Sequence, residues 1–419
     1  MWALTCCSFL RIGATGIGGG RFTCRPECYP AAVNPTQSPH RFRTCRRPQA
    51  IALRPFGRSL TPALLFALAL LLTLGPAPCG AQAAAAIEAP AAESLETQPT
   101  LTFPRFAPGK PIRMVAYGDM RFTDPSVTAG TNPRVRKWLA QRVAAEHPEA
   151  LLLTGDMPYT GAKTADWQVF QDETADWRVG RILQLPATGN HETNGGKQQG
   201  IANYLSNFPQ IAGHLYYSAL LGSVEVISLD CTGSTGASSP QARWFAAQLD
   251  HLPSQVEFLL ILYHIPWMVD QQSEMLANLP SKDALAFRDL LEARLDRLRA
   301  RVVVFNGHVH SYERFERRGV EYIVTGGGGA EPYPVLLRGS ADLYRDTGFP
   351  VYHYLTLEVR AHQLHAIMWK VKDPEAATLT VEKKDEFTLT PTLTPAPSAP
   401  ARKPASSSPG KAAAVPQLR

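Results

Sequence analysis

Five short stretches of this 419-residue chain hold side chains suited to metal-assisted chemistry, and each follows a run of apolar residues. They contain Asp119 and Arg121, then Asp156 and Tyr159, then Asn190, His191 and Glu192, then His264, and finally His308 and His310. Carboxylate, amide and phenolate oxygens with imidazole nitrogens suit two close metal ions of the iron, zinc or manganese kind. Such a pair indicates hydrolysis of a phosphate ester.

The apolar runs predict strands that alternate with helices. We expect strands at 112–117, 150–154, 182–186, 258–263, 302–305, 322–325, 353–358 and 364–369, and a hairpin of 214–218 with 224–230. Helices are expected at 133–146, 239–250 and 281–300, the first two capped by Asn132 and Ser239 with proline following. This order predicts an α/β (α+β layered) domain built on one or two sheets.

In such folds, ligands lie beyond the carboxyl ends of the strands. Taken alone, Asp119 or Asp156 would be a turn residue and His264 a core histidine, since both are common roles. Five such stretches in chain order favour one shared site instead.

The five stretches resemble the calcineurin-like metallophosphoesterase superfamily and, within it, the purple acid phosphatases. The superfamily pattern is D-x-H, GD, GNH[DE], a lone His and GHxH. Residues 155–159 (GDMPY) match the GDxxY of purple acid phosphatases, and residues 307–314 (GHVHSYER) resemble their GHxHxYER. Residues 213–230 look like that family's central hairpin, and the likeness covers 113–369. The resemblance implies a two-sheet β-sandwich flanked by helices.

The resemblance also implies a ligand set. Asp119, Asp156, Tyr159 and His310 would hold one metal, which is iron(III) in that family. Asp156 would bridge to a second metal (iron, zinc or manganese) that also takes Asn190, His264 and His308.

Arg121 departs from the family pattern. The superfamily has a histidine ligand there, purple acid phosphatases usually have glycine, and a guanidinium does not ligate metals. We predict Arg121 as a catalytic residue that binds phosphate; a surface ion pair with Asp124 is the alternative. His191 is predicted to orient the phosphate or protonate the leaving oxygen. Glu192 is expected to fix a loop or a histidine.

Other nearby residues carry structural expectations. Residues 312–314 are expected to form a turn with an ion pair, and the glycines 326–329 a flexible loop beside the site, because no GK[ST] follows them. Trp267 is expected to wall the pocket or to pack in the core.

The first 83 residues indicate export. Residues 1–58 hold nine Arg, one acidic residue and five of the seven Cys; we expect them to be unstructured sequence upstream of a misplaced start, with an organelle transit segment or a twin-arginine signal as alternatives. Residues 59–83 have the layout of a signal peptide, and their apolar run at 60–74 is short for a membrane span. We therefore expect a secreted or periplasmic protein, with an uncleaved membrane anchor as the less favoured alternative.

The remaining boundaries follow from composition. Residues 84–99 read as an Ala-rich linker, 100–372 as the catalytic domain, and 373–419 as a disordered tail rich in Pro, Thr, Ser and Ala. Too few residues separate the signal peptide from the first strand for the extra β-sandwich domain of larger purple acid phosphatases, so we expect a single-domain form. Beyond residue 58 the chain is near neutral and gives no nucleic-acid-binding signal.

These observations predict an exported, binuclear-metal phosphomonoesterase of the acid phosphatase kind. A metal-bound hydroxide would attack the phosphorus of a small phosphate ester in line. A phosphodiesterase acting on nucleotides or phospholipid headgroups is one alternative. A phosphate-binding pseudoenzyme is another, and the intact ligand set argues against it.

Overall fold

A computed structural model describes residues 100–273, 279 and 281–391. The predicted N-terminal extension, signal peptide and linker, and the part of the predicted tail beyond 391, lie outside the described residues. Within the described part, no helix has the length and apolar character needed to cross a membrane.

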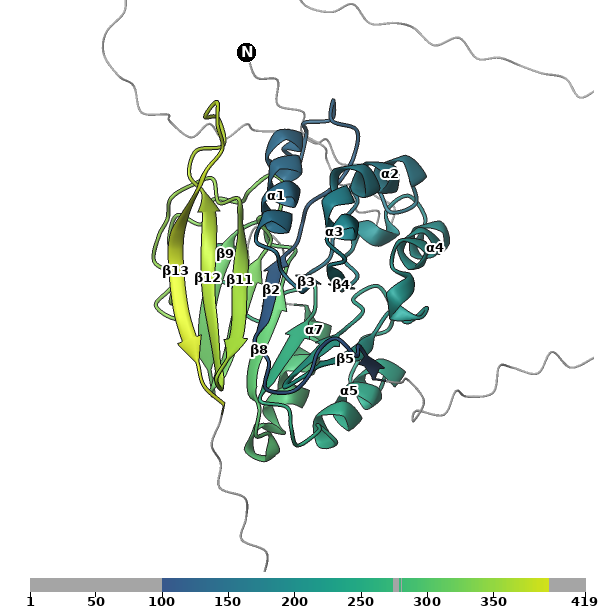
Figure 1. Cartoon of the computed structure of the whole chain (residues 1–419), viewed down its shortest axis with the longest axis vertical. Coiled ribbons are helices and arrows are strands. Elements are labelled where there is room, and N and C mark those ends of the chain that lie inside the picture. Colours follow the sequence, from purple (N-terminus) through teal and green to yellow (C-terminus); the bar gives the residue numbers. More distant parts are fainter. Residues whose placement is uncertain (1–99, 274–278, 280, 392–419) are drawn as a thin grey trace, which may run out of the picture. The chain divides into compact units, whose positions relative to one another are not determined.

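Two mixed sheets form the framework (Figure 1). A seven-stranded sheet has the order β1-β5-β6-β7-β8-β10-β9 and a six-stranded sheet the order β13-β12-β11-β2-β3-β4. The first contains β1 (Leu101–Thr102), β5 (Tyr217–Leu221), β6 (Val224–Ser228), β7 (Phe258–Leu262), β8 (Arg301–Asn306), β9 (Tyr312–Arg317) and β10 (Val320–Thr325). The second contains β2 (Ile112–Tyr117), β3 (Ala150–Leu153), β4 (Leu183–Pro186), β11 (His353–Arg360), β12 (Gln363–Val371) and β13 (Val381–Leu389).

Helices flank these sheets. They are α1 (Pro133–Ala145), α2 (Thr164–Glu173), α3 (Ala175–Val179), α4 (Lys197–Asn207), α5 (Pro240–Asp250) and α7 (Lys282–Glu292). Strands β2, β3 and β4 run parallel to one another, and so do β6, β7 and β8. The predicted two-sheet layered fold is therefore confirmed.

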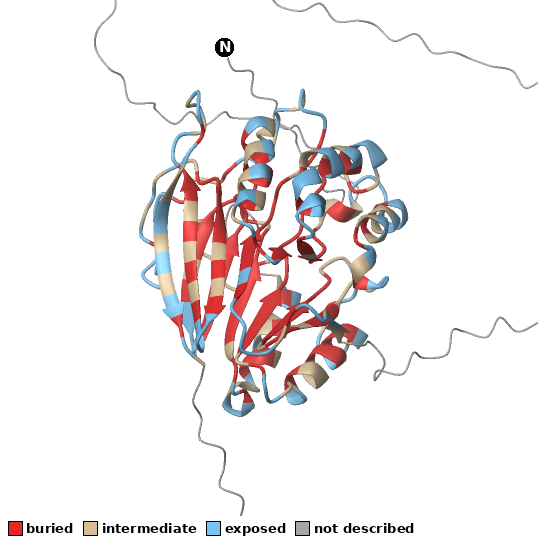
Figure 2. Cartoon of the chain, viewed as in Figure 1, coloured by how far each residue is buried: buried red, intermediate tan, exposed pale blue. Residues whose placement is uncertain are grey.

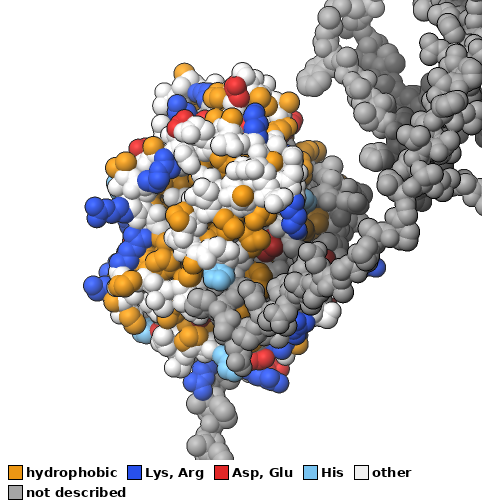
Figure 3. Space-filling model, turned by 90° about the vertical axis from the view of Figure 1, so that its right-hand side faces the viewer, with side chains coloured by type: hydrophobic (Ala, Val, Ile, Leu, Met, Phe, Trp, Pro, Cys, Tyr) orange, Lys and Arg blue, Asp and Glu red, His pale blue; other side chains and the backbone are white. Residues whose placement is uncertain are grey.

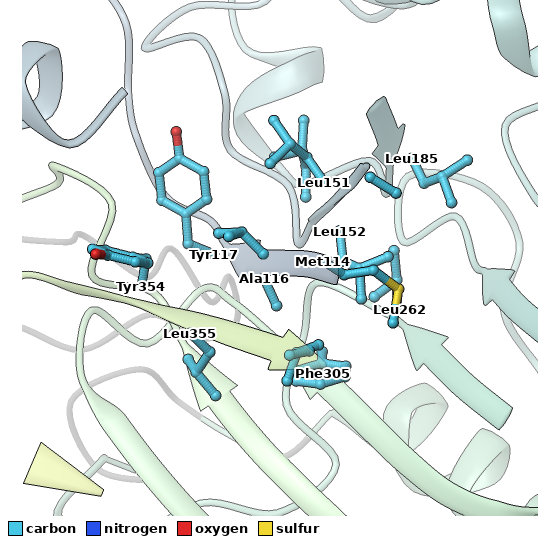
Figure 4. Packing of buried hydrophobic residues seen from close by; sticks show 14 of the residues in the cluster. Met114, Ala116, Tyr117, Leu151, Leu152, Leu185, Leu262, Phe305, Tyr354 and Leu355 are labelled. Carbon is cyan, nitrogen blue, oxygen red and sulfur yellow. The ribbon is translucent and has the colours of Figure 1, made fainter. Parts of the chain in front are cut away.

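One core lies between the two sheets. Met114 and Ala116 of β2 point toward Leu262 of β7 and Phe305 of β8, and all four belong to one buried cluster (Figure 4). Side chains alternate between the faces of a strand, so the neighbours of these residues point the other way. Because most of those neighbours are also buried apolar residues, the central strands are apolar on both faces.

A second core lies on the other face of the seven-stranded sheet. Ile261 and Val304 pack there with Phe245 of α5 and Phe287 of α7. Trp267 stacks on Phe287 with ring centroids 6.3 Å apart, so it belongs to this core.

Helix starts follow the sequence signals, but one helix end does not. The Asn132 side chain accepts from the Val135 amide, and the Ser239 hydroxyl accepts from the Ala242 amide, as predicted. The helix predicted at 281–300 ends at Glu292 and is followed by a 3-10 turn at Leu295–Arg297. The helix ends before 300 because the following residues bury Leu298 and connect to β8, which begins at Arg301.

Two predictions about the C-terminal half were wrong. Residues 312–314 are not a turn: they begin β9, which pairs antiparallel with β10. The predicted tail does not begin at 373, because β13 pairs with β12 from Val381 to Leu389, apart from a bulge at Lys384. As an edge strand, β13 presents charged residues to solvent, which is how edges avoid further pairing, and it therefore reads as polar sequence (Figure 2).

The helices between β3 and β5 were not predicted. Apolar residues are few in α2, α3 and α4, and aromatic packing holds them together instead. The aromatic cluster contains Trp167, Phe170, Trp177, Tyr204 and Phe208.

Candidate metal centre

The predicted site residues follow strands of both sheets. Asp119, Asp156 and Asn190 come after β2, β3 and β4 of the six-stranded sheet. His264 follows β7, and His308 and His310 follow β8, in the seven-stranded sheet. Because the carboxyl ends of these parallel strands meet at one end of the sandwich, side chains from both sheets converge there.

Asp156, Asn190, His264 and His308 form one compact group. Asn190 Oδ1 lies 3.1 Å from His264 Nε2 and 3.0 Å from His308 Nδ1. His264 Nε2 lies 3.3 Å from Asp156 Oδ1. Ligands about 2.0–2.2 Å from one ion are about 2.8–3.1 Å apart at octahedral angles and about 3.3–3.6 Å apart at tetrahedral angles, so these spacings fit a shared metal.

A second group shares Asp156 and contains Asp119 and His310. His310 Nε2 lies 3.6 Å from Asp119 Oδ1. Both His310 Nε2 and Asp156 Oδ2 are buried without a hydrogen-bond partner among the described residues. Atoms from Asp119, Asp156 and His264 lie within 4.8 Å of one another, a grouping that could hold a metal ion. A buried nitrogen and a buried carboxylate oxygen without hydrogen-bond partners are atoms whose lone pairs a bound cation would satisfy.

Several residues at these strand ends have a strained backbone. Asp119, Arg121, Asp156 and His308 have φ of 59°, 54°, 53° and 69°, a region that residues other than glycine rarely adopt. Hydrogen bonds lock these loops together: the Asp119 amide donates to the Gly155 carbonyl, and the His308 amide donates to the Asp119 carboxylate. Such conformations persist where surrounding structure imposes them, typically at functional sites.

Hydrogen bonds also fix which nitrogen each histidine presents. His264 Nδ1 donates to the Thr154 carbonyl at 2.8 Å, and His310 Nδ1 donates to the Glu331 carbonyl at 2.7 Å. In both rings Nε2 is left with its lone pair toward the site, as metal ligation requires.

The electrostatics suit cation binding. Burial, followed by nearby positive charge, lowers the pKa of His308 to about 4 and that of His310 to about 3, so both rings are neutral. Burial raises the pKa of Asp156, but His264, His191 and Arg121 outweigh it and hold that pKa below its usual range. Burial and the Asp156 carboxylate raise the pKa of Asp119 well above its ordinary value. A cation would relieve the repulsion between these two carboxylates.

Glu192 supports the loops, as predicted. Its carboxylate accepts hydrogen bonds from the amides of Asp156, Met157 and Gly189 at 3.1, 2.9 and 2.6 Å. Burial and the nearby Asp156 raise its pKa to about 8. Glu192 therefore positions the Asp156 turn and does not enter the ligand groups.

The structure brings His191 and Arg121 to the site. His191 Nε2 lies 3.9 Å from Asp156 Oδ2, and its Nδ1 donates to the Tyr159 carbonyl at 2.6 Å. Arg121 Nη2 lies 3.5 Å from Asp156 Oδ2, so its ionic partner is Asp156 and not Asp124.

Tyr159 lies at the edge of the site. Its ring meets that of His191 edge-on at 5.7 Å, and a Cβ at Gly130 would lie 3.5 Å from its hydroxyl. No hydrogen bond to this hydroxyl is found in the described part of the chain. The predicted ligation of a metal by Tyr159 therefore remains a prediction.

Sequence reasoning missed Tyr333. Its ring lies over that of His310, with centroids 4.5 Å apart, and its amide donates to the His310 carbonyl. It belongs to the long connection between β10 and β11, which has no periodic pattern, so no sequence signal marked it. The glycines at 326–329 lie in the same connection and are buried; a Cβ at Gly326 would lie 2.9 Å from Asp119 Oδ2.

Comparisons with known proteins agree with this arrangement. Residues 112–312 match the family model for calcineurin-like phosphoesterases. Purple acid phosphatase 21 of Arabidopsis thaliana is 28% identical over 246 residues, which cover 52% of this chain and 50% of that protein. Probable purple acid phosphatase 20 of the same plant is 27% identical over 275 residues, covering 58% and 56%.

A solved purple acid phosphatase from yellow lupin (Lupinus luteus) seeds has a similar fold. The TM-score is 0.53 at 16% identity, with 68% of this chain and 55% of that chain covered. The present chain spans about half the length of the curated relatives it matches. The family match covers all the predicted ligands, from β2 to the start of β9. Residues 112–312 therefore form a calcineurin-like phosphoesterase domain, and the chain resembles the purple acid phosphatases.

Proposed function

We propose that this protein is an exported, metal-dependent phosphomonoesterase of the acid phosphatase kind. The observation that carries the proposal is the pair of ligand groups that share Asp156 where the two sheets meet. Two ions bridged by one carboxylate are the arrangement that phosphate-ester hydrolysis uses.

The proposed ligands form two sets. Asp156, Asn190, His264 and His308 would hold one ion; Asp119, Asp156, Tyr159 and His310 would hold the other. The hard oxygen donors of the second set favour iron(III), and the imidazole-rich first set suits iron, zinc or manganese. When bound, the ions would supply charge neutralisation for the phosphate and acidify a water molecule.

His191 and Arg121 would act on the substrate directly. Since His191 Nδ1 donates to a carbonyl, its Nε2 faces the site and can deliver a proton to the leaving oxygen. The Arg121 guanidinium can donate two parallel hydrogen bonds to phosphate oxygens. Two donors beside Asp156 match the two negative charges of a terminal phosphate, and for this reason we favour monoesters over diesters.

Export is proposed from the signal-peptide layout of residues 59–83. The surface also bears on partners. On the face in Figure 3, basic side chains stand apart and form no continuous track in the part that is not grey. The near-neutral charge beyond residue 58 favours a small phosphate ester over nucleic acid as substrate.

The test compares hydrolysis of p-nitrophenyl phosphate with that of bis(p-nitrophenyl) phosphate by the purified protein. We expect turnover of the monoester that a chelator abolishes and added metal restores. Asp156→Asn should lower kcat/KM by more than about 10³-fold, because both ligand sets lose their shared carboxylate. Elemental analysis and the visible spectrum would identify the ions.

Asp124→Asn, a change in an exposed aspartate nearby, is the matched control and should retain activity. Preference for the diester would favour the phosphodiesterase alternative. Absence of metal-dependent turnover on either ester would leave the pseudoenzyme.

A further inference from the structure

The Arg121 guanidinium occupies a position among the predicted metal ligands. Its Nη2 lies 3.5 Å from Asp156 Oδ2, the oxygen that faces away from the Asn190 and His264 group. Its side chain is only 15% exposed, and its Nε is buried without a hydrogen-bond partner among the described residues.

The same guanidinium also lies near a second predicted ligand of that position, Tyr159. A Cβ at Gly130 would lie 3.5 Å from the Tyr159 hydroxyl and 3.9 Å from Arg121 Nη1. Arg121 therefore lies beside Asp156 and near Tyr159, whereas Asn190 makes its short contacts to His264 and His308.

The backbone of Arg121 leaves little freedom to withdraw. Its amide donates to the Asp156 carbonyl at 3.1 Å, and its own carbonyl accepts from Arg136 Nη1 at 3.1 Å. These bonds and the φ of 54° fix the backbone of Arg121, and its side chain extends from there to Asp156.

We propose that Arg121 is a resident cation that weakens metal binding at the Asp119–Asp156–His310 position, so that the two metal positions differ sharply in affinity. This inference rests on the proposed metal site. A permanent positive charge a few ångströms from a second cation repels it, and the repulsion is large in a buried site. The guanidinium already offsets the charge of Asp156, one of the carboxylates that the metal would use. The Asn190–His264–His308 position uses the other oxygen of Asp156, Oδ1, and should keep more of its affinity.

Metal content measures the inference directly. The purified protein is loaded with excess Zn²⁺ or Mn²⁺, dialysed against metal-free buffer and analysed for metal per chain; metal titration by calorimetry gives the affinities. We expect one tightly held equivalent in the wild type and two in Arg121→Gly, with the second Kd tightened at least about tenfold by removal of the charge. Glycine suits φ of 54°, so this variant should fold.

Two further variants separate charge from packing. Arg121→Lys retains the cation and should keep a single tight equivalent. Lys137→Gln removes an exposed charge from α1 and should match the wild type. Two tight equivalents in the wild type would overturn the inference and leave the proposed function standing. Absence of bound metal in every variant would overturn both.

Discussion

One hydrogen-bonding device recurs at the histidines of the site. His191, His264 and His310 each donate Nδ1 to a backbone carbonyl and so present Nε2 to the centre. Their different neighbours then separate their roles. His264 and His310 meet carboxylates at 3.3 and 3.6 Å, while His191 stays 3.9 Å from Asp156 and is half-buried. This geometry leaves His191 free to handle a proton.

Replacing His191 should show a leaving-group dependence. We expect His191→Asn to lower kcat by about 10²–10⁴-fold for an alkyl phosphate, whose alkoxide must be protonated as it leaves. The loss should be much smaller for p-nitrophenyl phosphate, because p-nitrophenolate departs without a proton. Steady-state kinetics on both esters checks this, with His214→Gln as the control. Equal losses on the two esters would contradict a role in protonation and leave phosphate orientation.

At one pair of edges, the Asp385 carboxylate links the two sheets. Asp385 of β13 accepts from the Tyr312 hydroxyl at 2.8 Å and from Arg314 Nε at 2.7 Å, both on β9. Arg314 also pairs with Glu321 of β10 at 3.0 Å and lies over the ring of Phe387. These contacts make β13 a closing element of the sandwich.

Removal of this carboxylate should loosen the sandwich. We expect Asp385→Ala to lower the free energy of unfolding by about 2–3 kcal/mol, because it leaves a half-buried guanidinium and a buried hydroxyl without their acceptor. Glu386→Ala makes the same charge change one residue along, at an exposed pair, and should have little effect. Chemical denaturation followed by circular dichroism measures both; equal effects would contradict the linking role.

Across the whole molecule, several buried carboxyl groups away from the metal centre make the folded state more stable at acidic pH than at neutral pH. Burial raises the pKa of Glu225 to about 7 and that of Asp342 to about 7, and it also raises those of Glu313 and Glu321. Between pH 4.5 and 7 the folded chain holds the Glu225 proton, whereas the unfolded chain has released it. The contribution of Glu225 to stability is therefore present at acidic pH and is lost as the pH rises through that window.

Glu225 gives a clear test, because its Oε2 is buried without a hydrogen-bond partner in the described part of the chain. Glu225→Gln should be more stable than the wild type at pH 8, by up to about 3 kcal/mol, and nearly equal to it at pH 5. Free energies of unfolding measured at both pH values check this, with exposed Glu375→Gln as the control. A difference that does not change with pH would contradict the assignment.

From the sequence, candidate site residues could be predicted where an apolar strand ends in polar residues. Residues whose positions depend on packing between distant segments could not be predicted. The ends of β2, β3, β7 and β8 carry the expected residues because buried apolar runs are easy to recognise. Strand β13 was missed because an edge strand must be polar, and Tyr333 because its position depends on the long connection that carries it. The contact of Arg121 with Asp156 depends on a left-handed backbone, which no spacing rule predicts.

Because the proposed ligands come from both sheets, the metal centre of a newly made chain can form only when the sheets have docked. Of the proposed ligands, four follow strands of the six-stranded sheet and three follow strands of the other, and Asp119 and His308 are 189 positions apart in sequence. Long-range contacts of this kind form late in folding. Neither sheet alone can assemble the centre. Under the proposed function, a chain whose two sheets have formed but not docked would not hydrolyse phosphate esters. Recovery of hydrolysis during refolding would therefore time the docking of the two sheets and not the formation of either one.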